Sequence, residues 1–530
     1  RRIETTAQVI VDTADCAIGI DAANLVLMGL KGFRDDFEEH ILHHRCLGSL
    51  RNPVPCVALC PAGVDIPGYI SLVNAGRCDD AVRLIRKDNP FPTACAYICE
   101  HPCEARCRRN MVDDALNIRG LKRYAVDHAG SVPQPKCAPA TGKKIAVIGG
   151  GPGGLSAAYY LALMGHHVAV FEKRQKLGGM MRYGIPSYRF PRELLDAEIE
   201  SILSLGIEVH TGIKVGNEVS FDELKANYDC LYISIGAHTD KKVGIEGEDS
   251  VGVISAVQML GQIGDDEMPD FTDQNVVVVG GGNVAMDVTR SAIRLGAKKV
   301  TCVYRRRQDD MTAQSEEVEG AIAEGAEVLT LHAPLRIESD DQNHVTALWA
   351  QPQIIGEFDS AGRPRPNTAE VPPLRIPADT VIVAIGQGIE SRGLEESGIK
   401  LQRSGTLTAR PDTQLPNMEA VFAGGDCVTG PATVIRAIAA GKAAAANIDE
   451  YLGFNHEITA DVTVPTPLCS DLRPRGRVNP SERDASERKC DFNCIECGMT
   501  DEEAAQESSR CLRCDHFGYG NFKGGRVEKW

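Results

Sequence analysis

Two short apolar runs, each followed at once by a glycine-rich turn and a helix-like segment, stand out in the hydrophobic pattern of the chain. The first run ends at Ile148 and continues as Gly-Gly-Gly-Pro-Gly-Gly from Gly149. The second run ends at Val279 and continues as Gly-Gly-Gly-Asn from Gly280. A strand, a tight turn and a helix in this order are the context of a dinucleotide-binding fingerprint. We therefore expect two βαβ units, each placing a pyrophosphate at a helix N-terminus.

The residues that end the next apolar run differ between the two units. In the first unit this run ends in Glu172, whose carboxylate can accept a hydrogen bond from a ribose hydroxyl. In the second unit it ends in Arg305, Arg306 and Arg307, whose guanidinium groups suit a 2′-phosphate. The chain is therefore expected to hold two different dinucleotides, the second of them NADP(H).

Composition narrows the class of protein. At 530 residues the chain is long enough for three or four domains. A net charge of −16 argues against binding to nucleic acid or to an anionic membrane surface. The Ala-rich run from Pro431 to Ile448 is interrupted by Arg436 and Lys442, so no apolar stretch reaches the ~18 residues of a membrane span. With no visible signal peptide, a cytoplasmic protein is expected.

The cysteines are concentrated in two places. Of the 19 in the chain, eight lie between Cys46 and Cys107 and five between Cys490 and Cys514. Clusters of this kind beside intracellular nucleotide motifs favour metal or iron–sulfur ligation over disulfides.

Further motifs carry a resemblance to a known family. The first unit continues through Leu177-Gly178-Gly179 to Arg182, the second contains Val303-Tyr304-Arg305-Arg306, and Gly424-Gly425-Asp426 precedes the helix that begins near Pro431. With these motifs, residues 46–515 resemble the small subunit of bacterial glutamate synthase. Its relatives include the large subunit of the NADH-dependent ferredoxin:NADP oxidoreductase and the N-terminal half of dihydropyrimidine dehydrogenase.

The resemblance implies hydride transfer between NADPH in the second unit and FAD in the first, with no protein acid or base required. The implied FAD-binding residues are Gly149, Gly151, Gly153, Gly154, Glu172, Lys173, Gly178, Gly179, Arg182, Gly425, Asp426 and Thr433. The implied NADP(H)-binding residues are Gly280, Gly282, Asn283, Val284, Ala285, Arg305, Arg306 and Gly386. Two simpler interpretations stay open, in which Asp426 only caps a helix and Arg307 is only surface charge.

A disulfide-reductase activity is not expected. That chemistry needs a Cys-x-x-Cys pair beside the flavin. Between residues 143 and 460 the only cysteines are Cys230, Cys302 and Cys427, isolated from one another and typical of small buried apolar residues.

The resemblance also implies two N-terminal [4Fe–4S] clusters. One would be held by Cys60, Cys99 and Cys103, and the other by Cys56, Cys107 and, as a candidate, Cys46. The family's Glu or Gln ligand is replaced here by Lys122, and a protonated lysine cannot ligate iron. The fourth ligands of the two clusters are therefore open, and Cys95 or another group is left to complete a site.

The C-terminal module contains a second metal signal. Cys494-x-x-Cys497 and Cys511-x-x-Cys514 are separated by 13 residues, a pattern typical of metal sites. The spacer begins Thr500-Asp-Glu-Glu503, which predicts a capping box and a short helix that brings the two pairs together. Zinc and an iron–sulfur cluster both suit such a site, and the cluster is favoured in an electron-transfer protein.

The N-terminal segment carries a different resemblance. Asp12-Thr-Ala-Asp-Cys16 and the stretch from Phe33 to Ile41 look like the end of the NADH-binding flavoprotein subunit of complex I and of bifurcating hydrogenases. There the cysteine that matches Cys16 is the fourth ligand of a cluster, but this chain has no cysteines upstream. We expect a docking segment, with Cys16 either inert or completing a site with a partner chain.

Together these features predict an α/β protein with two Rossmann-like, glutathione-reductase-type domains, a helical iron–sulfur domain before them and a small Cys-rich module after them. The expected boundaries are 1–45 for the docking segment, 46–130 for the iron–sulfur domain, 143–250 with 385–460 for the FAD-binding domain, 251–384 for the NADP(H)-binding domain and 489–530 for the C-terminal module.

The expected function is that of an NADP(H)-dependent flavoprotein subunit in an anaerobic, multisubunit redox complex, with an electron-bifurcating NADH/ferredoxin:NADP transhydrogenase as the nearest context. Its expected partners are an NADH-binding flavoprotein subunit, a ferredoxin-like subunit and ferredoxin. One alternative is the small subunit of an NADPH-dependent glutamate synthase. A structural scaffold with a zinc site is the alternative from another class.

Overall fold

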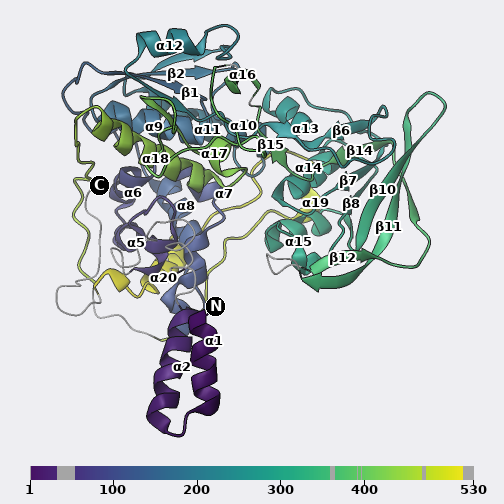
Figure 1. The fold of residues 1–530 in the computed structure, drawn as a ribbon, viewed down its shortest axis with the longest axis horizontal. Helices are drawn as coiled ribbons and strands as arrows, with labels where there is room; N and C mark the ends of the chain where they lie inside the picture. The colour runs from purple at the N-terminus through teal and green to yellow at the C-terminus, as the bar shows by residue number, and fades with distance from the viewer. Residues whose placement is uncertain are drawn as a thin grey trace.

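The computed structural model describes residues 2–32, 37, 54–358, 364–390, 392–395, 397–467 and 473–516. Cys46, Phe33 and Ile41 lie outside the described residues. Two parallel five-stranded sheets, each with helices packed against it, confirm the expected α/β class (Figure 1).

The first sheet has the strand order β16-β4-β1-β2-β3. Its central strand β1 is buried along nearly its whole length, as a parallel strand covered on both faces should be. Helices α9 and α18 pack against one another beside this sheet. The elements of this part are β1 (Lys144–Ile148), α9 (Pro152–Leu163), β2 (His167–Glu172), α10 (Met180–Tyr183), α11 (Arg192–Leu203), β3 (Glu208–Thr211), α12 (Phe221–Asn227), β4 (Cys230–Ile233), α16 (Arg392–Glu395), β16 (Val421–Ala423), α17 (Asp426–Thr429) and α18 (Val434–Tyr451).

The second sheet has the order β6-β14-β7-β8-β9, and an antiparallel sheet formed by β10 to β13 lies beside it (Figure 1). The short strands β5 (Thr239–Asp240) and β15 (Gln387–Gly388) pair where the chain passes between the two parts. The elements of the second part are β6 (Val253–Ser255), α13 (Ala256–Gly264), β7 (Asn275–Val279), α14 (Asn283–Arg294), β8 (Lys299–Val303), η3 (Gln308–Asp310), α15 (Ser315–Ala323), β9 (Glu327–Leu329), β10 (His332–Ser339), β11 (Val345–Phe358), β12 (Pro364–Thr368), β13 (Leu374–Pro377) and β14 (Thr380–Val383).

A cysteine-rich helical domain packs on the first part through α7 and α18. Its elements are α4 (Pro55–Leu59), α5 (Ile66–Asn74), α6 (Cys78–Asp88), α7 (Pro92–Ile98), η1 (Pro102–Arg106), η2 (Arg108–Met111) and α8 (Ile118–His128). The C-terminal segment returns to this domain, because α20 (Asp501–Ser509) contacts α5 and α8 (Figure 1). The remaining C-terminal elements are α19 (Ala485–Arg488) and η4 (Cys514–His516).

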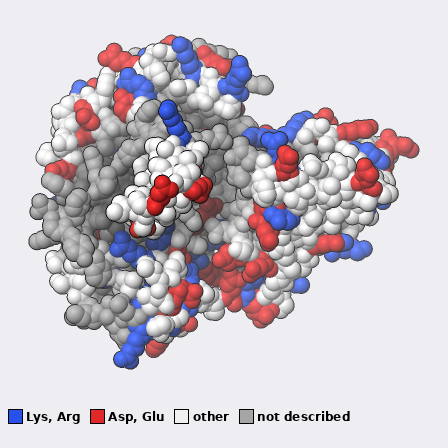
Figure 2. All heavy atoms as spheres, turned by 60° about the horizontal axis from the view of Figure 1, so that its bottom comes forward, with Lys and Arg blue, Asp and Glu red and all other residues white. Residues whose placement is uncertain are grey.

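An N-terminal hairpin of α1 (Arg2–Thr13) and α2 (Ala17–Gly32) projects from the body of the molecule (Figure 1). Figure 2 turns this end of the molecule toward the viewer and shows few charged side chains on it. Large apolar side chains are exposed there, including Ile18, which is 81% exposed, and Leu25. Among the described residues, no helix has the length and apolar character needed to cross a membrane.

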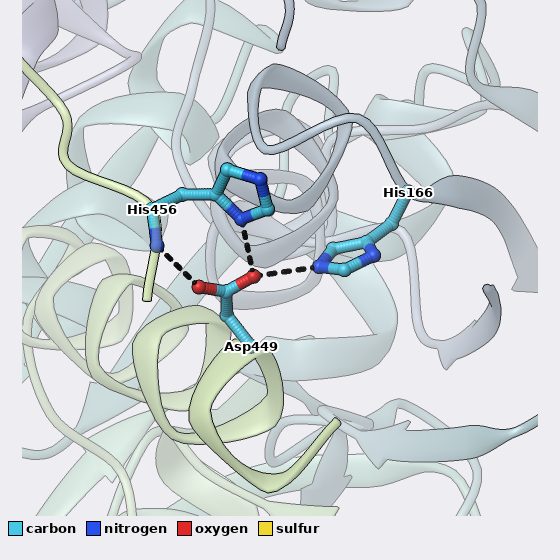
Figure 3. Close-up of side chains that lie close together, drawn as sticks. All are labelled: His166, Asp449 and His456. Carbon is cyan, nitrogen blue, oxygen red and sulfur yellow. Dashed lines mark hydrogen bonds and ion pairs between the residues drawn. The ribbon is translucent and has the colours of Figure 1, made fainter. Parts of the chain in front are cut away.

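A His–Asp–His cluster, with His166 and Asp449 buried and His456 half-buried, joins the segment after α9 to the end of α18 (Figure 3). His166 Nε2 and His456 Nδ1 lie 2.9 and 2.7 Å from the same carboxylate oxygen of Asp449. At these distances each nitrogen donates a proton to the carboxylate. On its other side, His166 Nδ1 lies 2.7 Å from the hydroxyl of Thr141. The cluster is therefore a satisfied hydrogen-bond clamp between two helices.

Candidate functional site

A cavity of about 370 Å³ lies at the carboxyl ends of β1, β2 and β4, where nucleotides bind in open parallel sheets. At Gly149, φ is +111° and a Cβ atom would lie 2.3 Å from the carbonyl oxygen of Ser234. A Cβ at Gly153 would lie 2.6 Å from the Ser234 hydroxyl. Only glycine therefore fits this turn. The predicted residues that line the cavity are Gly149, Gly151, Gly153, Glu172, Lys173, Gly179, Gly425 and Asp426.

Glu172 is held in place at the edge of this cavity. Its side chain is buried, and its two carboxylate oxygens accept hydrogen bonds from the backbone N–H groups of Gly150 at 2.7 Å and Arg174 at 2.8 Å. A carboxylate offers about four acceptor sites, so each oxygen can still accept a ribose hydroxyl. The neighbouring Lys173 pairs with Glu390 at 2.9 Å, and Glu390 also lines the cavity.

Helix N-termini and one half-buried carboxyl group set the electrostatics of this cavity. Helix α9 starts from Gly151 and α18 from Thr433, and neither helix has a side-chain cap on its first N–H groups. Such N-termini favour negative charge. Burial raises the pKa of Asp426 to about 6, although the backbone N–H of Ala432 lowers it. Asp426 is thus a half-buried acceptor that faces the cavity.

Four predicted FAD-binding residues do not line the cavity. They are Gly154, Gly178, Arg182 and Thr433. A Cβ at Gly154 would lie 1.9 Å from the carbonyl oxygen of Gly149, so this glycine allows α9 to pack closely on the turn. The buried guanidinium of Arg182 donates to the Leu177 carbonyl at 2.8 Å and pairs with Asp196. These contacts fix the guanidinium between Leu177 and Asp196, and its place along the flavin stays a prediction.

A second cavity, of about 740 Å³, lies at the carboxyl ends of β7, β8 and β14. A Cβ at Gly280 would lie 2.4 Å from the carbonyl oxygen of Ala384, and α14 starts from Gly282 without a side-chain cap. The turn is therefore built like the first. Its predicted lining residues are Gly280, Gly282, Asn283, Val284, Arg305, Arg306 and Gly386. Ala285 is buried behind the turn, where its Cβ would lie 3.2 Å from a Cβ at Gly280.

The three consecutive arginines have different environments. Arg305 is exposed and lines the cavity. Arg306 is buried, and its Nε donates to the Pro364 carbonyl at 3.0 Å. Arg307 pairs with Asp310 at 2.8 Å and does not line the cavity. Arg305 is therefore the side chain best placed to meet a 2′-phosphate.

The two cavities and the cysteine-rich domain adjoin one another. Gly425 lines the first cavity, and Ala432, beyond the short helix α17 in the same connection from β16 to α18, lines the second. Glu100, which follows Cys99, also lines the second cavity. The side-chain amide of Asn283 donates to the Glu100 carboxylate at 2.7 Å. The connection from β16 to α18 therefore links the two nucleotide cavities, and a hydrogen bond links the second cavity to the cysteine-rich domain.

One group of cysteines surrounds Lys122 on α8. The thiols of Cys95, Cys99, Cys60 and Cys103 interact electrostatically with its buried ammonium group. Burial lowers the pKa of Lys122, but these four thiols raise it above its usual value. A hydrogen bond from Cys95 lowers the pKa of Cys99 to about 6, and Lys122 acts in the same direction. The structure thus brings Cys95 to the three cysteines expected to share one cluster, while Lys122 supplies positive charge beside them.

A second group unites cysteines from the two ends of the chain. Cys56, Cys107, Cys511 and Cys514 line one small, largely apolar cavity, whereas Cys494 and Cys497 do not. The prediction that the two C-terminal pairs come together is therefore wrong. The capping box of Thr500 and Glu503 is confirmed, but it opens a nine-residue helix. Such a helix is about 14 Å long and separates the pairs.

The half-buried thiols of this second group fit a ligand that supplies positive charge. Burial raises the pKa of Cys56 and Cys514 above the usual value, and that of Cys511 to about 12. Such thiols lose their protons when they bind a metal. Among the described residues, the only group of three potential ligands within 4.8 Å of one another is the His–Asp–His clamp. A single zinc ion would hold its four sulfurs about 4 Å apart, and among the described residues no three of these thiols lie within 4.8 Å of one another.

Sequence reasoning missed several residues at these sites. Ser234 and His238, which follow β4, both line the first cavity. The apolar run that ends at Ile233 predicts a strand whose carboxyl end lies at this site. Burial lowers the pKa of His238 to about 4, so it is neutral at pH 7. Glu100 at the second cavity had no local signal. The three isolated cysteines of the nucleotide domains, Cys230, Cys302 and Cys427, are all buried, as expected.

Comparisons with known proteins agree with this geometry. The model of the pyridine nucleotide-disulphide oxidoreductase family matches residues 143–441. The model described as dihydropyrimidine dehydrogenase domain II, 4Fe-4S cluster, matches residues 36–132. Among solved structures, FprA from Mycobacterium tuberculosis aligns with a TM-score of 0.52 at 20% identity, over 60% of this chain and 85% of FprA, which supports the fold.

Curated relatives match over most of the chain. The beta subunit of the NADP(+)-dependent formate dehydrogenase of Moorella thermoacetica is 37% identical over 88% of this chain and 71% of its own length. The beta subunit of the NADPH-Fe(3+) oxidoreductase of Geobacter sulfurreducens is 34% identical over 97% of this chain and 84% of its own length. The small chain of the NADPH glutamate synthase of Escherichia coli is 34% identical over 77% of this chain and 90% of its own length.

The FAD, NADP(H) and [4Fe–4S] cofactors expected from the sequence are those of this family. The fold, the two glycine turns and the cysteine-rich domain all match it. The chain therefore belongs to the pyridine nucleotide-disulphide oxidoreductase family, in the group of oxidoreductases related to the glutamate synthase small subunit.

Proposed function

We propose that this chain is the NADP(H)-dependent flavoprotein subunit of an electron-bifurcating NADH/ferredoxin:NADP transhydrogenase. The observation that carries the proposal is the contiguity of its three sites. The connection from β16 to α18, which contains Gly425 and Ala432, lines both nucleotide cavities, and Glu100 joins the second cavity to the cysteine-rich domain. Such an arrangement suits a chain that exchanges hydride at one end and single electrons at the other.

The chain's own residues bind and orient the cofactors. When bound, FAD exchanges a hydride with NADP(H) and passes electrons onward one at a time. The turn that starts at Gly149 and the carboxylate of Glu172 would hold its adenosine half. The uncapped N-terminus of α18 would favour negative charge on its ring. Arg305 would select the 2′-phosphate of NADP(H), and the two cysteine groups would hold [4Fe–4S] clusters.

The relatives support a role within a larger complex. Two of them are named as beta subunits, of an NADP(+)-dependent formate dehydrogenase and of an NADPH-Fe(3+) oxidoreductase. The exposed apolar side chains of the hairpin α1–α2 suit burial against a partner subunit. We assign this hairpin to the docking of the NADH-binding flavoprotein subunit. A chain lacking residues 1–32 should keep its flavin but no longer co-purify with that partner.

Coupled turnover tests the bifurcation directly. In the balanced reaction, two NADPH reduce one NAD⁺ by two electrons and two oxidised ferredoxins by one electron each, releasing two NADP⁺, one NADH and one proton. The complex, purified through a tag on this chain, should oxidise NADPH rapidly only when NAD⁺ and ferredoxin are both present. Rapid oxidation with either acceptor alone would contradict the proposal.

Glutamate synthesis is the second candidate function. It is favoured by the 34% identity to the E. coli small chain over 90% of that protein's length. In that case the electrons would pass to a large, glutamine-using partner. Formation of glutamate from glutamine and 2-oxoglutarate by the purified complex would establish this function in place of bifurcation.

Purified chain without any bound FAD would instead support the scaffold alternative.

A further inference from the structure

We propose that the C-terminal segment completes an N-terminal cluster, so that Cys511 and Cys514 join Cys56 and Cys107 as the four ligands of a single [4Fe–4S] cluster. The pair Cys511 and Cys514 then does not form a separate metal site with Cys494 and Cys497. This inference rests on the proposed role of the cysteine-rich domain as a cluster carrier, and it names the residues that hold one of the two clusters.

The placement of the four thiols is the first argument. They line one cavity whose other walls are mainly apolar side chains, among them Ile66, Ile70 and Leu116. The thiols of Cys511, Cys107 and Cys514 all lie close enough to Cys56 to interact with it electrostatically, as does that of Cys103. Four thiols in one cavity match the four ligands of a [4Fe–4S] cluster. A cluster in this cavity would need no further ligand. It would therefore not depend on a cysteine upstream of Cys56, where this region has only Cys46.

The second argument is that the C-terminal segment is anchored at this cavity. Glu507, fully buried in α20, accepts hydrogen bonds from the backbone N–H groups of Asn117 at 2.7 Å and Val478 at 2.9 Å. Arg510, which precedes Cys511, is 1% exposed and donates to Glu507 at 2.6 Å and to Asp113 at 2.9 Å. A buried network of this kind fixes Cys511 beside the turn that follows Cys107.

The third argument comes from the other C-terminal pair. Cys494 lies near Tyr97 and Arg123, at the far end of α20, and Cys497 is exposed. A helix of nine residues cannot be bent to bring the two pairs together without breaking its hydrogen bonds. The two pairs therefore belong to different places in the molecule, and only the second pair faces the cavity.

Iron content and EPR of matched double variants test the assignment. The variant Cys511→Ala/Cys514→Ala should lose about four irons and four sulfides per chain and one reduced-cluster EPR signal, with FAD content unchanged. The control variant Cys494→Ala/Cys497→Ala should retain that signal. A Cys511→Ala/Cys514→Ala protein with unchanged iron and EPR would overturn the inference. A wild-type protein with FAD but no iron would instead contradict the cluster-carrier role itself.

A labelling experiment covers the case in which the double variant does not fold. In the single variant Cys56→Ala, the lost cluster should leave Cys511 and Cys514 open to alkylation, read by mass spectrometry, while Cys60 and Cys99 stay protected. Continued protection of both C-terminal cysteines in a Cys56→Ala protein that has lost four irons would also overturn the inference.

Discussion

Arg510 donates a hydrogen bond of 2.9 Å to Asp113, although 397 residues separate them in the sequence. Asp113 also pairs with Arg109 at 2.6 Å, and Arg109 is as buried as Arg510. The two arginines together hold the pKa of the Asp113 carboxyl well below its usual value, Arg109 having the larger effect. This network joins the end of the chain to the cysteine-rich domain near its beginning.

Loss of Arg510 should strongly destabilise this junction. In Arg510→Met, the buried carboxylate of Glu507 loses its cationic partner, and Asp113 keeps only one of its two arginine partners. Leaving a buried charge without its partner should lower the free energy of unfolding by about 3–5 kcal/mol. The matched control is Arg483→Met, because Arg483 pairs with Asp491 on the surface and should contribute no more than ~1 kcal/mol. Urea unfolding of both variants measures the difference, and equal losses would argue against a buried junction.

Arg305 should determine the preference for NADP(H) over NAD(H). Removal of a charge-assisted contact to a phosphate costs about 1.5–3 kcal/mol, so Arg305→Ala should raise the KM for NADPH roughly 10- to 100-fold. The KM for NADH should stay within about twofold of the wild type. Arg307→Ala is the control, since Arg307 pairs with Asp310 outside the cavity. If Arg307→Ala gave the larger effect, the assignment of the 2′-phosphate site would be wrong.

Glu198 should make stability depend on pH. It lies on α11 and accepts hydrogen bonds from the backbone N–H groups of Thr93 and Ala94 at 2.6 and 2.9 Å, in the first turn of α7. Burial raises the pKa of Glu198 to about 7, although these hydrogen bonds lower it. The folded protein therefore keeps this proton to a higher pH than the unfolded chain does.

Between pH 4.5 and 7 the folded state then binds more protons than the unfolded state, so stability falls as the pH rises. Across this window the wild type should lose about 3 kcal/mol relative to Glu198→Gln. Denaturant unfolding of both proteins at several pH values measures this, and parallel stability curves would show that Glu198 ionises normally.

Lys122 should raise the reduction potential of the cluster at Cys60. Reduction adds a negative charge to a cluster, and a buried ammonium group nearby favours the reduced form. Lys122→Leu should therefore lower the midpoint potential by on the order of 50 mV, since a tenfold shift in a one-electron equilibrium corresponds to about 59 mV. Lys136→Leu, in an exposed stretch, is the control. An unchanged EPR redox titration for Lys122→Leu would refute this role.

The nucleotide sites could be predicted from the sequence because their signals are local. A glycine turn directly follows each buried strand, Glu172 ends β2, and Arg305 lies two residues after the end of β8. The capping box at Thr500 was equally readable, since its hydrogen bonds join residues three apart. Each of these features follows from backbone geometry within a few residues of the motif.

The partners of Cys511 and Cys514 could not be predicted in the same way. Cys56 and Cys107 lie more than 400 residues earlier in the chain, and the nearer pair at Cys494 offered a plausible alternative. The choice depends on the buried contacts of Glu507 and Arg510, which form only when the end of the chain packs on α5 and α8. Likewise, the pairing of Arg182 with Asp196 depends on how α10 packs beside α11.

An anaerobic titration of the purified protein with NADPH and, separately, NADH tests the central claim most directly. The flavin absorbance band and the cluster EPR signals are followed together. The account predicts that NADPH bleaches the flavin at a far lower concentration than NADH does, and that the cluster signals then appear. Equal bleaching by the two nucleotides, or a reduced flavin with no cluster signal, would contradict it.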